Sequence, residues 1–136
     1  MGQTMAMMEW KDALKVGHGA IDRDHQRLVG LINELGDAMS AGKGKDVCGN
    51  VLDELIGYTK THFAMEEQLM AVHHYAATSG HKAEHAKLVQ DVVAFQDEFK
   101  AGTSILSVAL LHFLMEWLTH HILESDKALA QAIAHG

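Results

Sequence analysis

Proline is absent from this sequence, and cysteine and aromatic residues are scarce. Phe, Trp and Tyr make up 6% of the 136 residues, while Leu, Val, Ile, Ala and Met supply most of the 48% hydrophobic content. Proline interrupts helices and aromatic residues favour strands, so this composition favours an all-α fold. The length fits one domain, residues 1–136, built around a single core.

Long apolar runs and excess positive charge are also missing. The formal net charge is −7, which argues against a nucleic acid as partner because phosphate binders need the opposite sign. No run of 18 apolar residues occurs, so we expect the chain not to be embedded in a membrane. Cys48 is alone and residues 1–10 lack a signal-peptide pattern. We therefore expect a cytoplasmic monomer in which Cys48 is a small core residue.

Three short polar breaks divide the chain. They contain Gly or Ser and lie at 40–45, 75–80 and 101–104, which is typical of turns between helices. Asp46, Ser79 and Ser104 are the predicted N-caps. The pattern predicts an up-down-up-down antiparallel four-helix bundle with an N-terminal arm that carries Trp10 and packs across the bundle. The expected arm is 1–19, and the expected helices lie near 20–39, 46–73, 79–100 and 104–133.

Five of the eleven histidines occupy positions where a bundle helix normally carries Leu or Ile. In the first helix the inward stripe advances by four or three residues at each step, which is the spacing of a buried helix face. Its members are Ile21, His25, Leu28, Ile32, Leu35 and Met39. His62, His81, His85 and His121 continue comparable stripes. Buried imidazoles need partners, and few inward Ser, Thr or Asn could provide them. We expect the other six histidines to be solvated or hydrogen-bonded.

The same positions have the spacing of metal ligands. His62 and Glu66 are four residues apart, as are His81 and His85, so a helix points each pair in nearly the same direction. With His25, His121 and Asp126, the seven side chains exceed the six positions of one octahedral ion and favour a pair of ions. The mixed nitrogen and oxygen set favours iron or manganese.

The spacing from His121 to Asp126 does not fit a regular helix. Five residues correspond to about 140° around an ideal helix, so the two side chains would not share a face. If both are ligands, the helix must be distorted between them. We therefore predict an irregular, π-like or frayed turn within 121–127.

Taken together, these motifs resemble the bacterial hemerythrins. The resemblance covers nearly the whole chain and includes Trp10 and Tyr75, although Ala76 replaces a proline that often follows the tyrosine. The matching motifs are Ile21-Asp-Arg-Asp-His25-Gln-Arg-Leu28, His62-Phe63-x-x-Glu66-Glu67-x-x-Met70, His81-x-x-x-His85 and Trp117-Leu118-x-x-His121-Ile122-x-x-x-Asp126. The family implies two iron ions bridged by oxide or hydroxide inside a four-helix bundle.

The resemblance also assigns roles to individual residues. It implies that His81, His85 and His121 bind a coordinatively full iron. His25 and His62 would bind the second iron, which keeps an open position, and Glu66 and Asp126 would bridge the two. The implied walls of the oxygen pocket are Leu28, Phe63, Trp117, Leu118 and Ile122, which on sequence alone are ordinary core residues. The implied function is reversible binding of molecular oxygen for carriage or storage, and in one hypothesis delivery to an oxygen-consuming enzyme.

Three alternatives stay open at this point. His81-Lys-Ala-Glu84-His85 also has the spacing of an inverted zinc protease motif, with Glu84 as general base, although 136 residues leave little room for a peptide cleft. A ferritin-like di-iron oxidase would use Glu-x-x-His pairs, which this chain lacks, but turnover of peroxide as a side activity is compatible with the sequence. An oxygen or redox sensor that acts through a separate partner is the third alternative.

Overall fold

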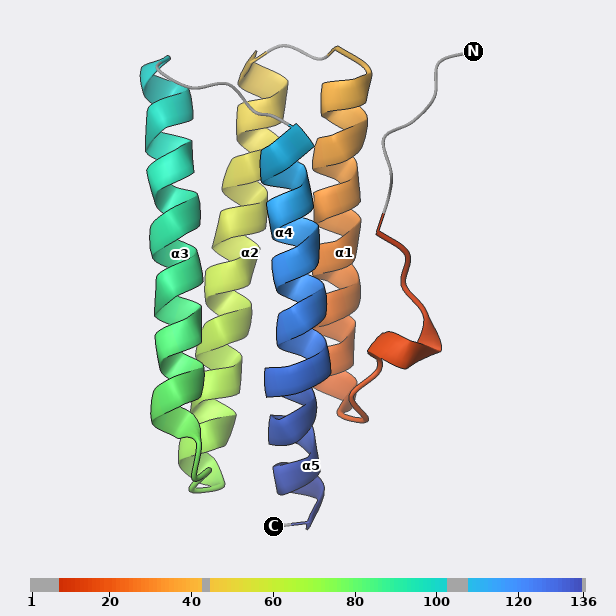
Figure 1. Ribbon diagram of the computed structural model, residues 1–136, viewed down its shortest axis with the longest axis vertical. Helices are drawn as coiled ribbons and strands as arrows, with labels where there is room; N and C mark the ends of the chain where they lie inside the picture. Colours follow the sequence, from red (N-terminus) through yellow and green to blue (C-terminus); the bar gives the residue numbers. More distant parts are fainter. Residues whose placement is uncertain (1–7, 43–44, 103–107, 136) are drawn as a thin grey trace.

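Four long helices lie side by side and alternate in direction in a computed structural model of the protein (Figure 1). The structure describes residues 8–42, 45–102 and 108–135, and those residues contain no β-strand. The four-helix bundle predicted from the sequence is therefore confirmed. The helices are α1 (Gly19–Ser40), α2 (Lys45–Val72), α3 (Thr78–Ala101) and α4 (Val108–His121), and the last is followed by η2 (Ile122–Asp126) and α5 (Lys127–His135).

The apolar stripes seen in the sequence form the core. Ile21, Leu28 and Leu35 of α1 are at most 2% exposed, in line with the alternating steps of three and four residues. Burying a side chain of this size contributes about 1.5–3 kcal/mol. Cys48 is also buried in the core, as expected. On each helix, the face that buries the apolar side chains also carries the histidines into the interior.

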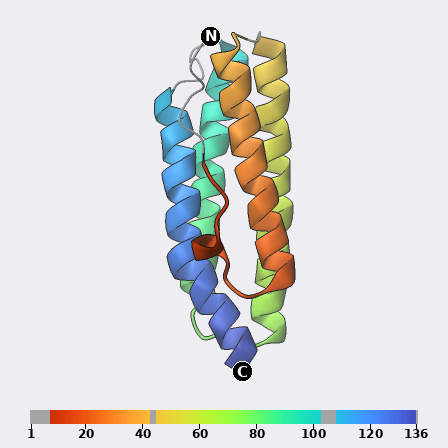
Figure 2. The same ribbon diagram turned by 90° about the vertical axis from the view of Figure 1, so that its right-hand side faces the viewer.

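The N-terminal arm packs along the bundle. From residue 8 to residue 18 it runs beside α1 and α4, with a short 3₁₀ turn, η1 (Asp12–Leu14) (Figure 2). Asn33 of α1 holds it with two hydrogen bonds, because its amide donates to the Met8 carbonyl (2.7 Å) and its carbonyl accepts from the Met8 amide (2.9 Å). Trp10 packs against the core, as the sequence predicted.

Two of the three predicted N-caps are wrong. Asp46 lies in the first turn of α2, and Ser79 lies inside α3, whose N-cap is Ala77. The α2–α3 turn explains the second error. The Tyr75 amide donates to the Met70 carbonyl (2.9 Å), and the Thr78 hydroxyl donates to the Tyr75 carbonyl (2.6 Å). Because the turn provides these backbone groups with hydrogen bonds, α3 begins at Thr78, before the predicted cap Ser79. Ser104, the third predicted cap, lies outside the described residues.

The predicted irregular turn is present. The backbone after His121 forms one π-helical turn from Ile122 to Asp126 and then returns to α-helix in α5. A π turn holds more residues than an α turn, so it brings positions five apart onto one face. His121 and Asp126 consequently both point into the bundle, which an uninterrupted α-helix would prevent.

Among the described residues, no helix is long and apolar enough to cross a membrane.

Candidate metal centre

Seven buried polar side chains meet in the interior, and every long helix of the bundle supplies at least one of them. Each is at most 4% exposed. They are His25 from α1, His62 and Glu66 from α2, His81 and His85 from α3, His121 from α4, and Asp126 from η2. The structure thus brings together all seven side chains that the sequence singled out as candidate ligands.

These side chains form two overlapping groups. One group contains Glu66, His81, His85, His121 and Asp126, and the other contains His25, His62, Glu66 and Asp126. Within each group, one donor atom from every residue lies within 4.8 Å of the others. Glu66 and Asp126 belong to both groups, which is the arrangement required of carboxylates that bridge two ions.

Each shared carboxylate divides its two oxygens between the groups. Asp126 places Oδ1 3.0 Å from Nε2 of both His81 and His121, whereas its Oδ2 lies 2.7 Å from Nε2 of His25.

Glu66 repeats this division. Its Oε1 lies 3.0 Å from Nε2 of His85, and its Oε2 lies 3.4 Å from Nε2 of His62. The five imidazoles therefore separate into a set of three and a set of two on opposite sides of the carboxylates.

Several buried donor atoms in the cluster lack ordinary hydrogen bonds. Among the described residues, seven such atoms have no well-aligned hydrogen bond, namely both Glu66 oxygens, both ring nitrogens of His25, Nε2 of His62, Nδ1 of His121 and Oδ2 of Asp126. An unsatisfied buried polar atom costs about 1–3 kcal/mol, so seven of them at one place indicate that something else binds there. A pair of metal ions would satisfy five of the seven, all except Nδ1 of His25 and Nδ1 of His121. The buried donor set fits a di-iron centre.

The electrostatics of the metal-free cluster lead to the same interpretation. Burial by itself would lower the pKa of the His81 and His121 imidazoles, but hydrogen bonds to Asp126 and Glu66 raise each pKa to about 9. Burial would raise the pKa of Asp126, but the imidazoles of His121, His25 and His81 that face its two oxygens lower it to about 2.

Glu66 behaves like Asp126. Burial would raise its pKa, yet the imidazoles of His121, His62, His81 and His85 that face its oxygens hold that pKa far below its ordinary value. Both carboxylates are therefore ionised at neutral pH, and in the absence of metal the cluster holds protons where cations would bind.

Outer hydrogen bonds orient two of the ligands. Nδ1 of His62 lies 2.9 Å from Oδ2 of Asp24, and Nδ1 of His85 lies 2.9 Å from Oε2 of Glu67. Such carboxylates fix the ring and leave Nε2 free to bind a metal. The sequence analysis did not assign roles to Asp24 or Glu67. Asp24 directly precedes His25 in the sequence and Glu67 directly follows Glu66. Because metal-bound histidines commonly pair with a carboxylate, these acidic neighbours of the candidate ligands could have been predicted to orient a histidine.

Glu84, the candidate base of a protease, lies outside the cluster. Its Oε2 accepts a hydrogen bond from the Ser125 hydroxyl (2.6 Å), and its Oε1 is 3.9 Å from Nδ1 of His121. His81 and His85 share their centre with five further buried donors, which differs from a single zinc ion with an adjacent catalytic glutamate. The arrangement therefore does not support the protease alternative.

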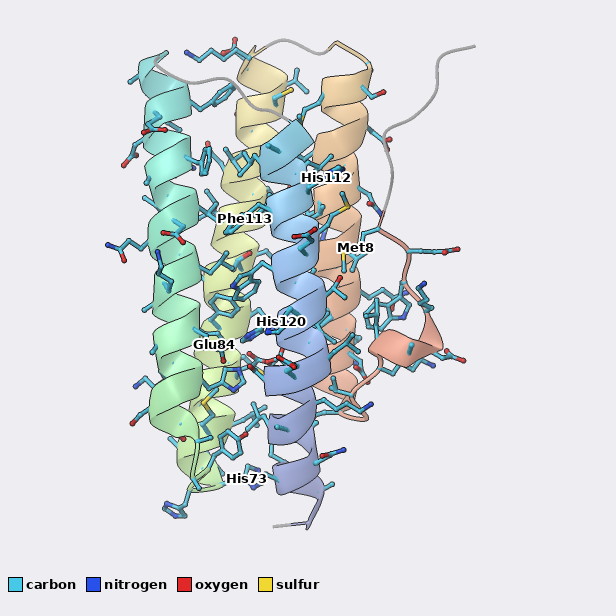
Figure 3. The ribbon with its side chains drawn as sticks, in the orientation of Figure 1. Met8, His73, Glu84, His112, Phe113 and His120 are labelled. Atoms are coloured by element: carbon cyan, nitrogen blue, oxygen red, sulfur yellow. The ribbon has the colours of Figure 1, made fainter. Side chains whose placement is uncertain are left out.

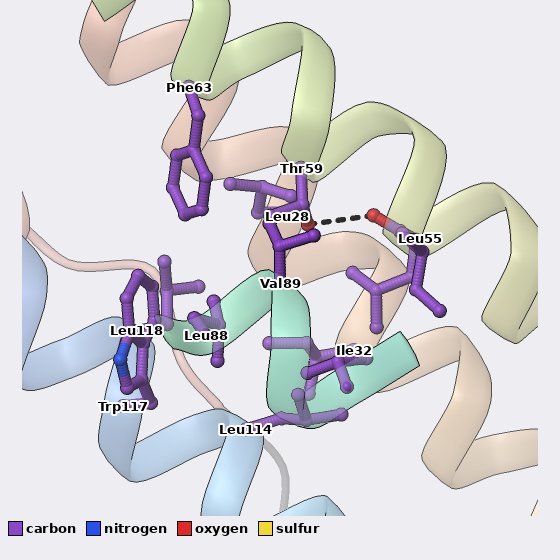
Figure 4. A pocket seen from close by; sticks show the side chains of 12 residues that line it. Leu28, Ile32, Leu55, Thr59, Phe63, Leu88, Val89, Leu114, Trp117 and Leu118 are labelled. Atoms are coloured by element: carbon purple, nitrogen blue, oxygen red, sulfur yellow. Dashed lines mark hydrogen bonds between the residues drawn. The ribbon is translucent and has the colours of Figure 1, made fainter. Parts of the chain in front are cut away.

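Figure 4 shows the side chains that line an apolar cavity of about 30 Å³, and one of them, Phe63, contacts the cluster. Four of the five residues named for the oxygen pocket line it, namely Leu28, Phe63, Trp117 and Leu118. Ile122 is fully buried but is not among the residues that line the cavity. The π turn places Ile122 in the same segment as Asp126, past the end of α4. Phe63 reaches the cluster directly, since its ring stacks on that of His85 with centroids 3.7 Å apart.

Of the remaining six histidines, four are exposed on helix or turn surfaces, and one of these four and a fifth have a local role. His73, His74, His112 and His120 are exposed, as expected for solvated imidazoles. His18 caps α1 by accepting a hydrogen bond from the Ile21 amide (3.3 Å), and His120 pairs with Glu124 one turn away (2.7 Å). The side chain of His135 lies outside the described part of the chain.

Comparisons with known proteins agree with this site. The family model described as the hemerythrin HHE cation binding domain matches residues 16–133. The chain is 36% identical to the bacteriohemerythrin of Stenotrophomonas maltophilia over 129 residues, which covers 95% of this chain and 83% of the relative. It is also 36% identical to the bacteriohemerythrin of Methylococcus capsulatus, with coverage of 90% and 94%.

Solved structures give the same result. The crystal structure of a wild-type hemerythrin superposes on this protein with a TM-score of 0.87 at 33% identity, covering 95% of this chain and 99% of the other. The matched region contains all seven buried donors, from His25 to Asp126. With the family model, the relatives and the fold in agreement, this chain belongs to the hemerythrin family.

Proposed function

We propose that this protein binds molecular oxygen reversibly at a di-iron centre and serves in oxygen carriage or storage. The unequal division of the imidazoles carries the proposal. Three histidines and two carboxylate oxygens give one ion five protein donors, whereas two histidines and two carboxylate oxygens give the other four. One bridging solvent oxygen would make six and five, so an octahedral ion held by His25 and His62 keeps one open position.

Such a centre, with both ions ferrous, supplies the electrons that hold oxygen reversibly. The contribution of the chain is to limit what else reaches the open position. Leu28, Phe63 and Leu118 are each at most 4% exposed and surround the adjacent cavity with carbon atoms. A cavity of about 30 Å³ exceeds the roughly 10–15 Å³ that a water-sized molecule needs, so a diatomic gas fits it. The apolar walls disfavour water and hydroxide there.

None of the described residues that line the cavity has an acidic side chain, which favours binding over catalysis. Thr59 is the one hydroxyl-bearing side chain among the described lining residues, and its Oγ1 donates to the Leu55 carbonyl of its own helix (2.7 Å). Enzymes that split bound oxygen or peroxide use a positioned acid to protonate the leaving oxygen. A pocket without such an acid supports release of oxygen unchanged. We therefore favour oxygen binding over a di-iron oxidase or a peroxide-reacting enzyme.

Reversible oxygenation tests the proposal. The protein would be loaded anaerobically with Fe(II), exposed to oxygen, and then purged with argon while its visible spectrum and iron content are measured. We expect two irons per chain and a spectrum that appears with oxygen and disappears on purging over repeated cycles. Irreversible oxidation in the first cycle, with peroxide or water released, would overturn the proposal in favour of the enzyme alternative.

A second measurement separates carriage from sensing and tests delivery. If the protein is a carrier, its oxygenated form should raise the rate of an oxygen-consuming enzyme when free oxygen is limiting. The increase should be proportional to the amount of oxygen bound to the carrier. Metal-free protein at equal concentration is the control. A sensor would instead change its binding to a partner on oxygenation without supplying oxygen, and that outcome would favour the sensor alternative.

A further inference from the structure

One tryptophan connects the interior of the bundle with its surface. Trp117 lines the apolar cavity beside the metal cluster, and it also lines a surface hollow of about 720 Å³ on the outer side of α4. In Figure 4 its indole projects from α4 beside Leu118. Among the described residues, Trp117 is the one that lines both spaces.

The indole is in ring contact with a candidate metal ligand. Its ring and that of His121 are stacked, with centroids 4.5 Å apart and an interplanar angle of 17°. Nε2 of His121 in turn lies 3.0 Å from Oδ1 of Asp126 inside the cluster. The two stacked rings therefore lie between the surface hollow and the cluster of candidate ligands. Electron tunnelling falls steeply with distance through protein, so a contact of this kind is a favourable route for an electron.

The hollow has an apolar surface and negative charge. Phe113 is 37% exposed and Leu123 is 42% exposed, which is unusual for large hydrophobic side chains in this molecule. Figure 3 shows Phe113 and His120 on α4. Glu116 lines the hollow and is exposed, and none of the described lining residues is Lys or Arg. An apolar patch that carries a negative charge is typical of a surface that binds a partner of opposite charge.

We propose that Trp117 carries electrons to the di-iron centre from a one-electron donor that binds in this hollow and has a flat aromatic face and positive charge. The inference rests on the proposed function, because an oxygen-binding centre that oxidises to Fe(III) must be reduced before it binds oxygen again. Two donors each lose one electron, and each of two Fe(III) ions gains one and becomes Fe(II). The transfer forms and breaks no covalent bond.

Reduced methyl viologen tests the route, since its radical cation is flat, positively charged and a one-electron donor. Iron-loaded protein in the Fe(III) state would be mixed with it anaerobically, and the loss of viologen absorbance would be followed by stopped flow at increasing donor concentration. We expect the rate to saturate. Trp117→Leu should lower the limiting rate at least tenfold, and Trp117→Phe, which keeps a ring, should lower it less.

Two surface variants separate binding from transfer. Phe113→Ser and Glu116→Lys leave the indole in place, so we expect each to raise the half-saturating donor concentration severalfold without changing the limiting rate. Glu34→Lys, which makes the same charge change on the exposed side of α1, is the matched control. An effect of Glu34→Lys equal to that of Glu116→Lys would overturn the proposed binding site.

A binding measurement without iron completes the test. Oxidised methyl viologen quenches indole fluorescence on contact, so in metal-free Trp10→Phe protein it should quench Trp117 in a saturable way that Glu116→Lys weakens. Absence of saturable quenching would overturn the binding site. Equal reduction rates in Trp117→Leu and the parent, at equal iron content, would overturn the route. If the variants change reduction and quenching as expected but the protein does not bind oxygen reversibly, the proposed function is contradicted and the electron route is not.

Discussion

Asp24 joins Tyr58 to His62 through its two carboxylate oxygens. The Tyr58 hydroxyl donates to Oδ1 (2.8 Å), and Oδ2 lies 2.9 Å from Nδ1 of His62. Burial and the bond to Asp24 raise the pKa of Tyr58, so the phenol remains a donor throughout the neutral range. A partly exposed tyrosine thus sets the orientation of a carboxylate that fixes a buried candidate ligand.

Removing the Asp24 charge should weaken metal binding. In Asp24→Asn, the amide cannot hold the His62 ring as an ionised carboxylate does, and loss of such a partner typically costs 10–100-fold in metal affinity. Tyr58→Phe, which removes only the outer hydrogen bond, should cost less. Competition with a chelator measures the affinity. Asp37→Asn, on an exposed part of α1, is the control, and an equal loss there would assign the effect to net charge.

The π turn should compensate for the extra residue between His121 and Asp126. Deleting Leu123, an exposed residue of η2, leaves the two candidate ligands four positions apart, so a regular α-helix would still point both side chains into the bundle. We expect this variant to stay helical by circular dichroism and to bind two irons per chain. Inserting an alanine after Leu123 makes the spacing six, which turns Asp126 away from the cluster, so the iron content should fall below two per chain. Equal iron content in the deletion and insertion variants would contradict the role assigned to this turn.

A polar group in the cavity wall should speed oxidation of the centre. Leu118 is 4% exposed and lines the cavity, so Leu118→Asn places an amide that attracts water in the proposed oxygen pocket. We expect autoxidation in air to quicken severalfold and the free energy of unfolding to fall by about 1–3 kcal/mol. The decay of the oxygenated spectrum measures the first effect. Leu123→Asn, made at an exposed position, is the control; an autoxidation rate in Leu118→Asn no higher than in this control would argue against the pocket assignment.

Both bridging candidates should be needed to hold two ions. In Glu66→Gln an amide replaces a carboxylate whose two oxygens face different histidine sets, so it cannot neutralise charge on both sides. We expect the iron content to drop to one per chain or below. Glu34→Gln on the exposed side of α1 should keep two. Retention of two tightly bound irons in Glu66→Gln would mean that Asp126 alone is sufficient as a bridge.

The metal-free protein should lose stability as the pH rises. The pKa of His81 and of His121 is raised from 6.5 to about 9, so their contribution to stability is complete below pH 6.5 and is lost as the pH passes 9. The pKa of Asp126 is lowered from 3.8 to about 2, so its contribution is present above pH 3.8 and is lost as the pH falls through 2.

Urea unfolding at pH 5.5, 7.5 and 9.5 measures this dependence. We expect the free energy of unfolding of the metal-free protein to fall by roughly 1–3 kcal/mol across this range, and that of the metal-loaded protein to change less. In the loaded protein, metal cations replace the protons that the imidazoles would otherwise lose. Equal pH profiles for the two forms would contradict this explanation.

The sequence was most informative where one helix face carried the signal. The histidines at Leu-like positions, the four-residue spacing from His62 to Glu66, and the five-residue spacing from His121 to Asp126 are all local patterns. Each follows from the number of residues per helical turn, so the bundle and the π turn could be predicted. The convergence of seven donors on one place followed from the antiparallel arrangement.

Features that depend on contacts between helices were not predictable in the same way. Asp24 and His62 are 38 positions apart, and their pairing depends on how α1 and α2 rotate against each other. The start of α3 at Thr78 depends on turn hydrogen bonds rather than on a capping side chain. The stacking of Trp117 on His121 depends on a rotamer, which residue spacing does not specify.

The distribution of the candidate ligands over every long helix has a consequence for how bound ions would leave the protein. Fraying of any one helix end breaks only part of the coordination, and the remaining donors retain the metal until that end closes again. Release should therefore require cooperative opening of the whole bundle, so that the rate of metal exchange reports global unfolding. Oxygen, which needs only a single vacant position, can exchange through side-chain motion on a far shorter timescale.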